Sequence, residues 1–324
     1  MNIRTARHAA IVTIGATVIA STAAAQEYPT RPVRVVVPFS AGGPAELVAR
    51  LTGQKLAEQL GQQFIVDARG GGGGTIGVEI VAKAAPDGYT LLLHTVGHVI
   101  TPALYRKLPY DAAKDFAPIA LAYTSQLMMI VHPSVPVKTV KDLIGLARAK
   151  PNQVNYASSG NGGISHLAVH LFQTMAGIQM THVPYKGMAP GLADVVGGQV
   201  QMVTPDPAVA MPHVKSGRVV PLGLTGSKRI PAAPQIPTIA EAGIPGYEVV
   251  VWYGYLAPRG TPRNVIDRLH GGVVKAMASP EIRDRYLNDG ADVAVRGPED
   301  FGALLRIEFD KWAKVVKDSG VRID

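Results

Sequence analysis

The chain has 324 residues, of which 47% are hydrophobic and none is cysteine, and its formal net charge is +8. The length allows about two domains of ordinary size, and the missing cysteine excludes disulfides and thiol chemistry. Because the basic residues are dispersed and few residues are aromatic, the composition argues against a nucleic-acid surface and favours attraction of small anions.

The N-terminus has the three parts of a secretory signal peptide. Arg4 and Arg7 precede an apolar stretch over residues 9–20, and the sequence Ala-Ala-Ala over residues 23–25 fits a cleavage signal. The apolar run is too short to span a bilayer, which argues against an uncleaved membrane anchor. We therefore expect a signal peptide over residues 1–25, cleavage after Ala25, and export to a bacterial periplasm.

The stretch from Val33 to Arg50 predicts a strand, a glycine loop and the start of a helix. A β-branched run over residues 33–37 is typical of a buried strand, and Gly42 and Gly43 allow a tight turn. Pro44 suits the first position of a helix, since its missing N–H would have no partner there. Such a unit presents unpaired N–H groups and suits an anion, although an ordinary strand-to-helix turn has the same pattern.

Strands and helices alternate along the rest of the chain, which favours an α/β fold. We expect strands at 64–66, 89–93, 119–122, 128–131, 154–157, 182–185, 199–203, 219–224 and 249–256. Helices are expected after residue 75, at 139–149, between the loop at 158–163 and Gly177, and at 192–196, 265–277 and 301–316, whereas 102–116 looks irregular. The prediction is two domains, 26–129 plus 248–324 and 130–247, each a mainly parallel sheet flanked by helices, with a cleft between them.

Motifs for catalysis, cofactors and metals are weak in this sequence. Residues 72–77 fit the spacing G-x-G-x-x-G, but the acidic residue that a dinucleotide site needs about 20 residues further on is missing. His166 and His170 share one helix face without a third metal ligand. We find no G-x-S-x-G elbow and no Walker lysine. We therefore expect no enzyme activity, no cofactor and no bound metal.

Three predicted strands end in loops of small or polar residues, at 40–44, 158–163 and 185–187. In open α/β sheets, ligands bind beyond the carboxyl ends of the strands. Two such domains facing each other would place helix N-termini on both walls of a cleft, which suits a small anion.

An ordered set of segments resembles one protein family, the Bug-type solute receptors of the tripartite tricarboxylate transporters. The segments are Phe-Ser-Ala-Gly-Gly at 39–43, Ala-Pro-Asp-Gly-Tyr-Thr-Leu at 85–91, Leu-Pro-Tyr-Asp at 108–111, Tyr-Ala-Ser-Ser-Gly at 156–160, His-Val-Pro-Tyr-Lys-Gly at 182–187, Gly-Gly-Gln-Val at 197–200, Pro-Thr-Ile-Ala-Glu-Ala-Gly at 237–243 and Ala-Pro-Arg-Gly-Thr-Pro at 257–262. The resemblance implies a periplasmic binding protein of the type II-like, Venus-flytrap kind. It would be a monomer that closes around a small organic carboxylate, a di- or tricarboxylate or an aromatic acid, and delivers it to a membrane permease.

Loop position and this resemblance together give a predicted binding site. Its residues are Phe39, Ser40, Ala41, Gly42, Gly43, Glu46, Ser158, Gly160, Asn161, Gly162, His166, Tyr185, Lys186 and Asp206. Trp252 or Tyr253 is expected near the hinge. Glu46 stands where the family usually has aspartate, and Ala-Arg-Gly-Gly at 68–71 stands where it usually has Asn-Arg-Pro-Gly. We expect Glu46 to cap its own loop or to make a polar contact with the ligand.

Two other functions remain open from the sequence. An exported hydrolase of esters or amides would need a serine nucleophile and a histidine base, for which Ser158 and His166 are the nearest pair. A scaffold or adhesin without a small ligand would show no closure of the two domains.

Overall fold

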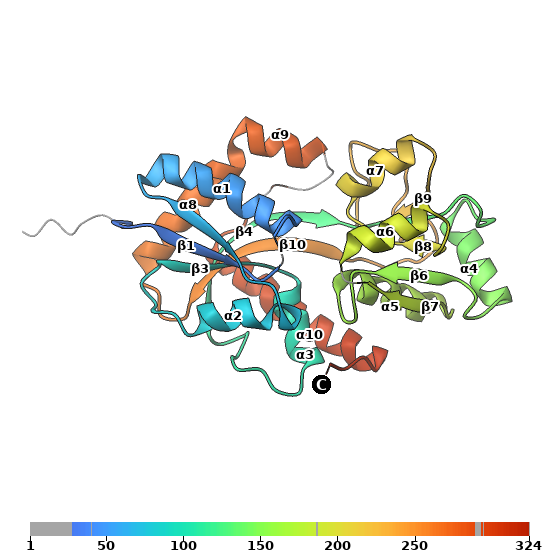
Figure 1. The fold of residues 1–324 in the computed structure, drawn as a ribbon, viewed down its shortest axis with the longest axis horizontal. Helices are drawn as coiled ribbons and strands as arrows, with labels where there is room; N and C mark the ends of the chain where they lie inside the picture. Colours follow the sequence, from blue (N-terminus) through green and yellow to red (C-terminus); the bar gives the residue numbers. More distant parts are fainter. Residues whose placement is uncertain (1–27, 40, 186, 289–292, 294, 324) are drawn as a thin grey trace, which may run out of the picture.

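The structure is a computed structural model that describes residues 28–39, 41–185, 187–288, 293 and 295–323. The predicted signal peptide and its cleavage site lie outside the described residues. Two five-stranded sheets, each with its own helices, form two lobes that lie side by side (Figure 1). In the described part of the chain, no helix is long and apolar enough to cross a membrane.

The first lobe is built on a sheet with the strand order β2-β1-β3-β10-β4. Its strands are β1 (Val33–Val37), β2 (Phe64–Ala68), β3 (Thr90–Thr95), β4 (Phe116–Gln126) and β10 (Val250–Pro258). Strand β1 pairs in parallel with β2 and β3, whereas β10 is antiparallel to both β3 and β4. The sheet is therefore mixed, with β2, β1, β3 and β4 running in one direction and β10 running against them.

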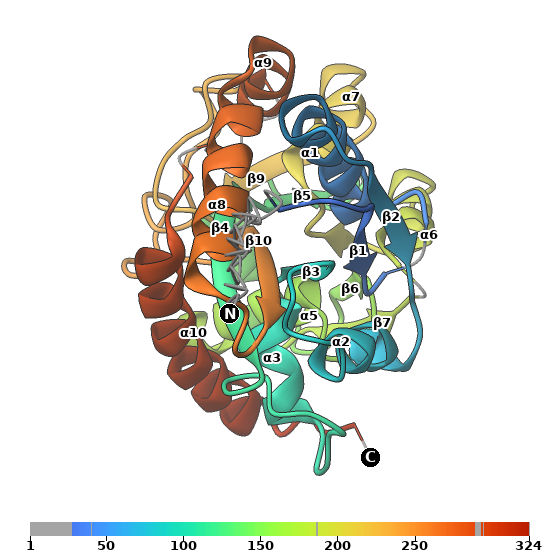
Figure 2. The same cartoon turned by 90° about the vertical axis from the view of Figure 1, so that its left-hand side faces the viewer.

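Helices cover both faces of this first sheet, as Figures 1 and 2 show. Helices α1 (Pro44–Leu60), α8 (Arg263–Ala278) and α9 (Pro280–Asn288) lie on one face. Helices α2 (Thr75–Ala82), α3 (Gly97–Leu104) and α10 (Pro298–Ser319) lie on the other, and a short 3₁₀ turn (Gly72–Gly74) precedes α2. The side chains of β10 alternate between these layers, since Tyr255 reaches Thr52 of α1 and the backbone of Gly254 lies under Phe301 of α10.

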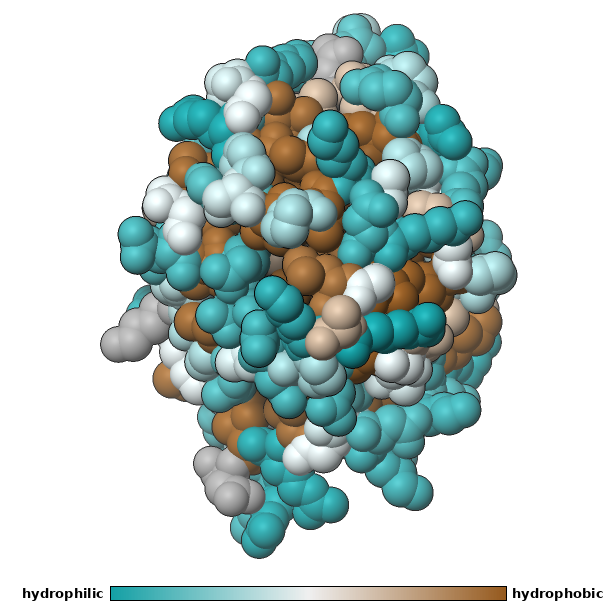
Figure 3. Space-filling model, turned by 90° about the vertical axis from the view of Figure 1, so that its right-hand side faces the viewer, coloured by the Kyte–Doolittle hydropathy of each residue, from teal (hydrophilic) through white to brown (hydrophobic). Residues whose placement is uncertain are grey.

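The second lobe is built on a mixed sheet with the order β7-β6-β8-β5-β9. Its strands are β5 (Met128–Val131), β6 (Asn155–Ser158), β7 (Thr181–Pro184), β8 (Met202–Val203) and β9 (Val220–Leu224), and its helices are α4 (Val140–Ala149), α5 (Ile164–Ala176), α6 (Met188–Val196) and α7 (Pro207–Lys215). Apolar residues of α4 and α5 continue the core of the first lobe, whereas α6 and α7 cover a separate apolar cluster. Hydrophilic residues cover most of the far end of this lobe, with apolar ones showing between them (Figure 3).

The predicted α/β fold of two helix-flanked sheets is confirmed. Two helices that the sequence analysis did not anticipate, α7 and α9, stand at the boundary between the lobes, and α3 occupies the start of the region expected to be irregular. The last three of the five consecutive glycines form the 3₁₀ turn (Gly72–Gly74), where the Tyr105 hydroxyl donates a hydrogen bond to the Gly72 carbonyl over 3.1 Å.

The chain passes between the lobes next to Thr225, which is fully buried. Its hydroxyl accepts a hydrogen bond from the N–H of Leu127, between β4 and β5, and donates one to the carbonyl of Val249, just before β10; both bonds measure 2.8 Å. The backbone of Thr225 also bonds to the same two residues. One side chain thus joins the two connections between the lobes, at Leu127 and Val249, to the end of β9. We refer to this region as the hinge.

Candidate functional site

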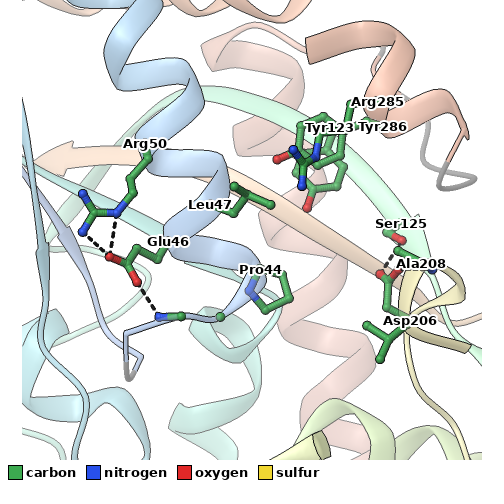
Figure 4. A pocket seen from close by; sticks show the side chains of 13 residues that line it. Pro44, Glu46, Leu47, Arg50, Tyr123, Ser125, Asp206, Ala208, Arg285 and Tyr286 are labelled. Atoms are coloured by element: carbon green, nitrogen blue, oxygen red, sulfur yellow. Dashed lines mark hydrogen bonds and ion pairs between the residues drawn. The ribbon is translucent and has the colours of Figure 1, made fainter. Parts of the chain in front are cut away.

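A cleft of about 450 Å³ lies between the lobes, with strand β4 at its floor (Figure 4). The first lobe contributes the start of α1, β4 and the end of α9, and the second lobe contributes the start of α7. The lining residues are Gly42, Gly43, Pro44, Glu46, Leu47, Arg50, Tyr123, Ser125, Asp206, Ala208, Val209, Arg285 and Tyr286. Of the predicted site residues, the structure brings Gly42, Gly43, Glu46 and Asp206 together here.

The loop between β1 and α1 forms one wall of the cleft. Gly42 has φ +88°, a conformation that residues with a side chain rarely adopt, and Pro44 begins the helix. Glu46 is 6% exposed, and its Oε2 accepts a hydrogen bond of 2.5 Å from the Gly42 N–H. Its Oε1 pairs with Arg50, one helical turn on. Glu46 therefore caps its own loop, one of the two roles expected for it.

The contacts of Glu46 also fix its charge. The hydrogen bond from Gly42 and the guanidinium of Arg50 lower the pKa of its carboxyl. The carboxylate is thus ionised at neutral pH, and Arg50 offsets its charge. An anion entering the cleft meets this wall as a neutral pair rather than as a bare carboxylate.

Three tyrosine rings stack at the floor of the cleft. Tyr123 of β4 lies 4.5 Å from both Tyr253 of β10 and Tyr286 of α9, measured between ring centroids. Burial and the nearby charge of Asp206 raise the pKa of the Tyr253 hydroxyl, so it stays protonated. Tyr253 thus packs beneath a tyrosine that lines the cleft, whereas Trp252 borders a different groove. The expected place of either residue near a hinge stays a prediction.

Asp206 stands opposite this wall, at the N-terminus of α7. Its Oδ1 accepts a hydrogen bond of 3.0 Å from the Ala208 N–H, and its Oδ2 accepts one of 2.8 Å from the Ser125 hydroxyl of β4. The side chain therefore caps its own helix and ties the second lobe to the floor of the cleft.

The loop after β6 has a different place from the one predicted. Ser158 is 1% exposed and does not line the cleft. Its Oγ lies 2.6 Å from Nε2 of His182, and the Gly160 N–H donates to it over 3.1 Å. Through these hydrogen bonds, Ser158 stabilises the conformation of its own loop. The pairing of Ser158 with His166 that a hydrolase would need is not present, since His182 takes that position.

His166 instead supports the following turn. Its Nδ1 accepts a hydrogen bond of 3.1 Å from the Gly162 N–H, and its ring stacks on that of His182 with 3.8 Å between centroids. Asn161 is exposed. A Cβ on Gly162 would lie 2.4 Å from Cδ1 of Leu104 in α3, so this loop touches the first lobe.

The remaining predicted residues also lie outside the cleft lining. Phe39 packs its ring against His94, and Ala41 is exposed. The Tyr185 hydroxyl donates a 2.5 Å hydrogen bond to Asp194, which raises its pKa to about 12 and turns the side chain toward α6. Ser40 and Lys186 lie outside the described residues. Within the described ranges, no group of three His, Asp or Glu side chains could hold a metal ion.

Sequence reasoning missed most of the side chains that line the cleft. Leu47 and Arg50 lie three residues apart in the predicted helix and so share a face, a signal that was available from the loop prediction. Tyr123 and Ser125 alternate on one strand, but only the pairing of β4 with β10 shows which face meets the cleft. Nothing in the sequence placed Arg285.

Comparison with known proteins shows which protein family this chain resembles. The family model described as "Tripartite tricarboxylate transporter family receptor" matches residues 48–321. The chain belongs to this family. The resemblance seen in the sequence is thereby confirmed.

Relatives of known sequence cover nearly the whole chain. A UPF0065 protein in the tcbD-tcbE intergenic region of Pseudomonas sp. strain P51 is 38% identical over 290 residues, which are 89% of this chain and 86% of the relative. Protein BugT of Bordetella pertussis is 31% identical over 307 residues, 94% of each chain.

Solved structures extend the agreement to the fold. A structure of R. palustris Rpa4515 with adipate has a TM-score of 0.83 and 38% identity, and it covers 91% of this chain and 99% of its own. MatC of Rhodopseudomonas palustris with bound malate has a TM-score of 0.80 and 34% identity, with 89% and 100% covered. The periplasmic binding protein BugD has a TM-score of 0.81 and 35% identity, with 91% and 99% covered. The fold is that of a two-domain periplasmic binding protein.

Proposed function

We propose that this chain is an extracytoplasmic receptor that captures a small organic carboxylate between its two lobes. The observation that carries the proposal is the cleft, because both lobes line it and the strands of the hinge form its floor. Family membership and the adipate and malate in two similar structures support the class of ligand.

The biological setting follows from the family. The receptor, cleaved after Ala25, would act in the periplasm as a monomer and deliver its ligand to the permease subunits of a tripartite tricarboxylate transporter. It would perform no catalysis and need no cofactor. The moving bodies would be residues 26–129 plus 248–324 and residues 130–247. Closure would bring the loop at 158–162 toward the ligand, since Gly162 already touches the first lobe.

A binding assay tests this function directly. The mature chain from Gln26 onward, freed of bound ligand by unfolding and refolding, is titrated calorimetrically with adipate, malate, citrate and benzoate. An acid present at a concentration of 100 times its dissociation constant should raise the free energy of unfolding by about 2.7 kcal/mol. The acid should be recovered unchanged, whereas a hydrolase would consume an activated ester.

A pair of variants locates the binding. Ala208→Trp places a large ring in the cleft and should abolish binding, whereas Val274→Trp, at an exposed position on α8 away from the cleft, should leave it intact. Equal affinity in both variants would place the ligand elsewhere, and no binding of any acid by the unmodified chain would contradict the proposed function.

A further inference from the structure

The charged residues that line the cleft differ in whether other groups of the protein already pair with them. Glu46 and Arg50 pair with each other, and Asp206 accepts hydrogen bonds from Ser125 and from the N–H of Ala208. Arg285 of α9 is exposed and makes no ion pair or hydrogen bond with any other residue that the structure describes. Among the described residues that line the cleft, Arg285 is therefore the cation that is not paired with another described side chain.

Helix α9 holds Arg285 at the edge of the cleft. Ile282 and Tyr286, four residues apart, are buried against the first lobe, and Glu281 pairs with Lys55 of α1 over 3.2 Å. Arg285 and Tyr286 are neighbours in α9, and both line the cleft (Figure 4). Packing of Ile282 and Tyr286 thus holds α9 in place, while the side chain of Arg285 stays exposed to solvent.

The rest of the lining is mostly apolar. Pro44 and Leu47 of α1 face the cleft from one lobe, and Ala208 and Val209 of α7 face it from the other. Val209 is 42% exposed, so its side chain is accessible to a ligand in the cleft. Closure of the lobes would press these surfaces onto the middle of a ligand and remove apolar area from water.

We propose that Arg285 anchors a single carboxylate and that the cleft selects acids with an apolar, ring-sized body over hydroxylated di- and tricarboxylates. This inference rests on the proposed function. A second carboxylate would lie against apolar side chains or near Asp206, where an unpaired charge is costly to bury. A benzoate-like acid meets the guanidinium at one end and Leu47, Val209 and Tyr286 along its ring.

The test compares benzoate with malate, and benzoate with its neutral amide. We expect benzoate to bind the refolded mature chain at least tenfold more tightly than malate, and at least tenfold more tightly than benzamide, each factor being equivalent to 1.4 kcal/mol. Arg285→Gln should lower the affinity for benzoate at least tenfold and remove most of its advantage over benzamide. Arg285→Lys, which keeps the charge, should restore part of that advantage.

Arg283→Gln is the matched control. Arg283 lies on the same helix, pairs with Asp284 and does not line the cleft, so its loss should leave the affinity for benzoate unchanged. Tighter binding of malate than of benzoate, or an unchanged preference for benzoate over benzamide in Arg285→Gln, would overturn this inference while the receptor function stands. Failure of every acid to bind the unmodified chain would instead refute the function itself.

Discussion

Thr225 provides the sharpest test of how the two lobes are joined. Thr225→Val keeps the shape of the side chain but removes the hydroxyl that bonds to Leu127 and Val249. A buried N–H and a buried carbonyl each lose one partner, and each such loss costs about 1–3 kcal/mol. We expect the free energy of unfolding to fall by about 2–4 kcal/mol, allowing for partial relaxation.

Urea unfolding followed by circular dichroism measures this loss, and Thr225→Ser is its control. The serine keeps both hydrogen bonds and removes one methyl group, for which we expect a loss of about 1 kcal/mol. Substitutions that disturb no specific interaction usually change the free energy of unfolding by less than about 0.5 kcal/mol. If the valine and serine variants differ in stability by no more than this, the role assigned to the hydroxyl is refuted.

Three further predictions follow from single contacts. Gly254→Ala should destabilise the protein by about 1–3 kcal/mol, since a Cβ would lie 2.2 Å from Cζ of Phe301, whereas Gly271→Ala, in open space on α8, should be neutral or stabilising by up to about 1 kcal/mol in thermal unfolding. Burial lowers the pKa of His98 to about 4. The unfolded chain therefore binds the proton first as pH falls, and His98→Gln should reduce the loss of stability between pH 7 and 5.5 by about 1.2 kcal/mol in urea titrations. Glu46→Gln removes a negative charge from the cleft and should tighten the binding of an anionic ligand about twofold to fivefold in low-salt calorimetry, with unchanged affinity contradicting the charge argument.

Local signals predicted the parts of the fold that are defined by neighbouring residues. The valine run at 33–37 followed by Gly42, Gly43 and Pro44 gave β1, its loop and the start of α1, because strand propensity, turn geometry and helix entry all depend on short stretches. Helix α9 had no such signal. Among the side chains of α9 that the structure describes, Ile282 and Tyr286 are the buried ones, and a polar helix this short has no clear hydrophobic periodicity.

The candidate site was harder to predict than the fold because its walls come from distant segments. The start of α1 was found because its glycines mark it, but Tyr123 meets Tyr253 only through the antiparallel pairing of β4 with β10. Ser158 has the sequence context of a binding loop, but it is buried and its hydroxyl is hydrogen-bonded to His182, so it does not face the cleft. Sequence spacing carries no information about either effect.

The hinge strands have a second groove on the face away from the cleft, and this arrangement links the two faces. The groove of about 510 Å³ lies between α10 and the loop at 226–228. Thr124, Gln126 and Trp252 line the groove, Tyr123 lines the cleft, and Ser125 lines both. Because β4 borders both spaces, we expect a bend at this strand that narrows the cleft to widen the groove. Ligand binding then has to break the contacts that hold the groove closed. The observed affinity equals the affinity of the closed form multiplied by the fraction of ligand-free molecules that are closed. Substitutions behind the hinge should therefore change affinity without touching the ligand.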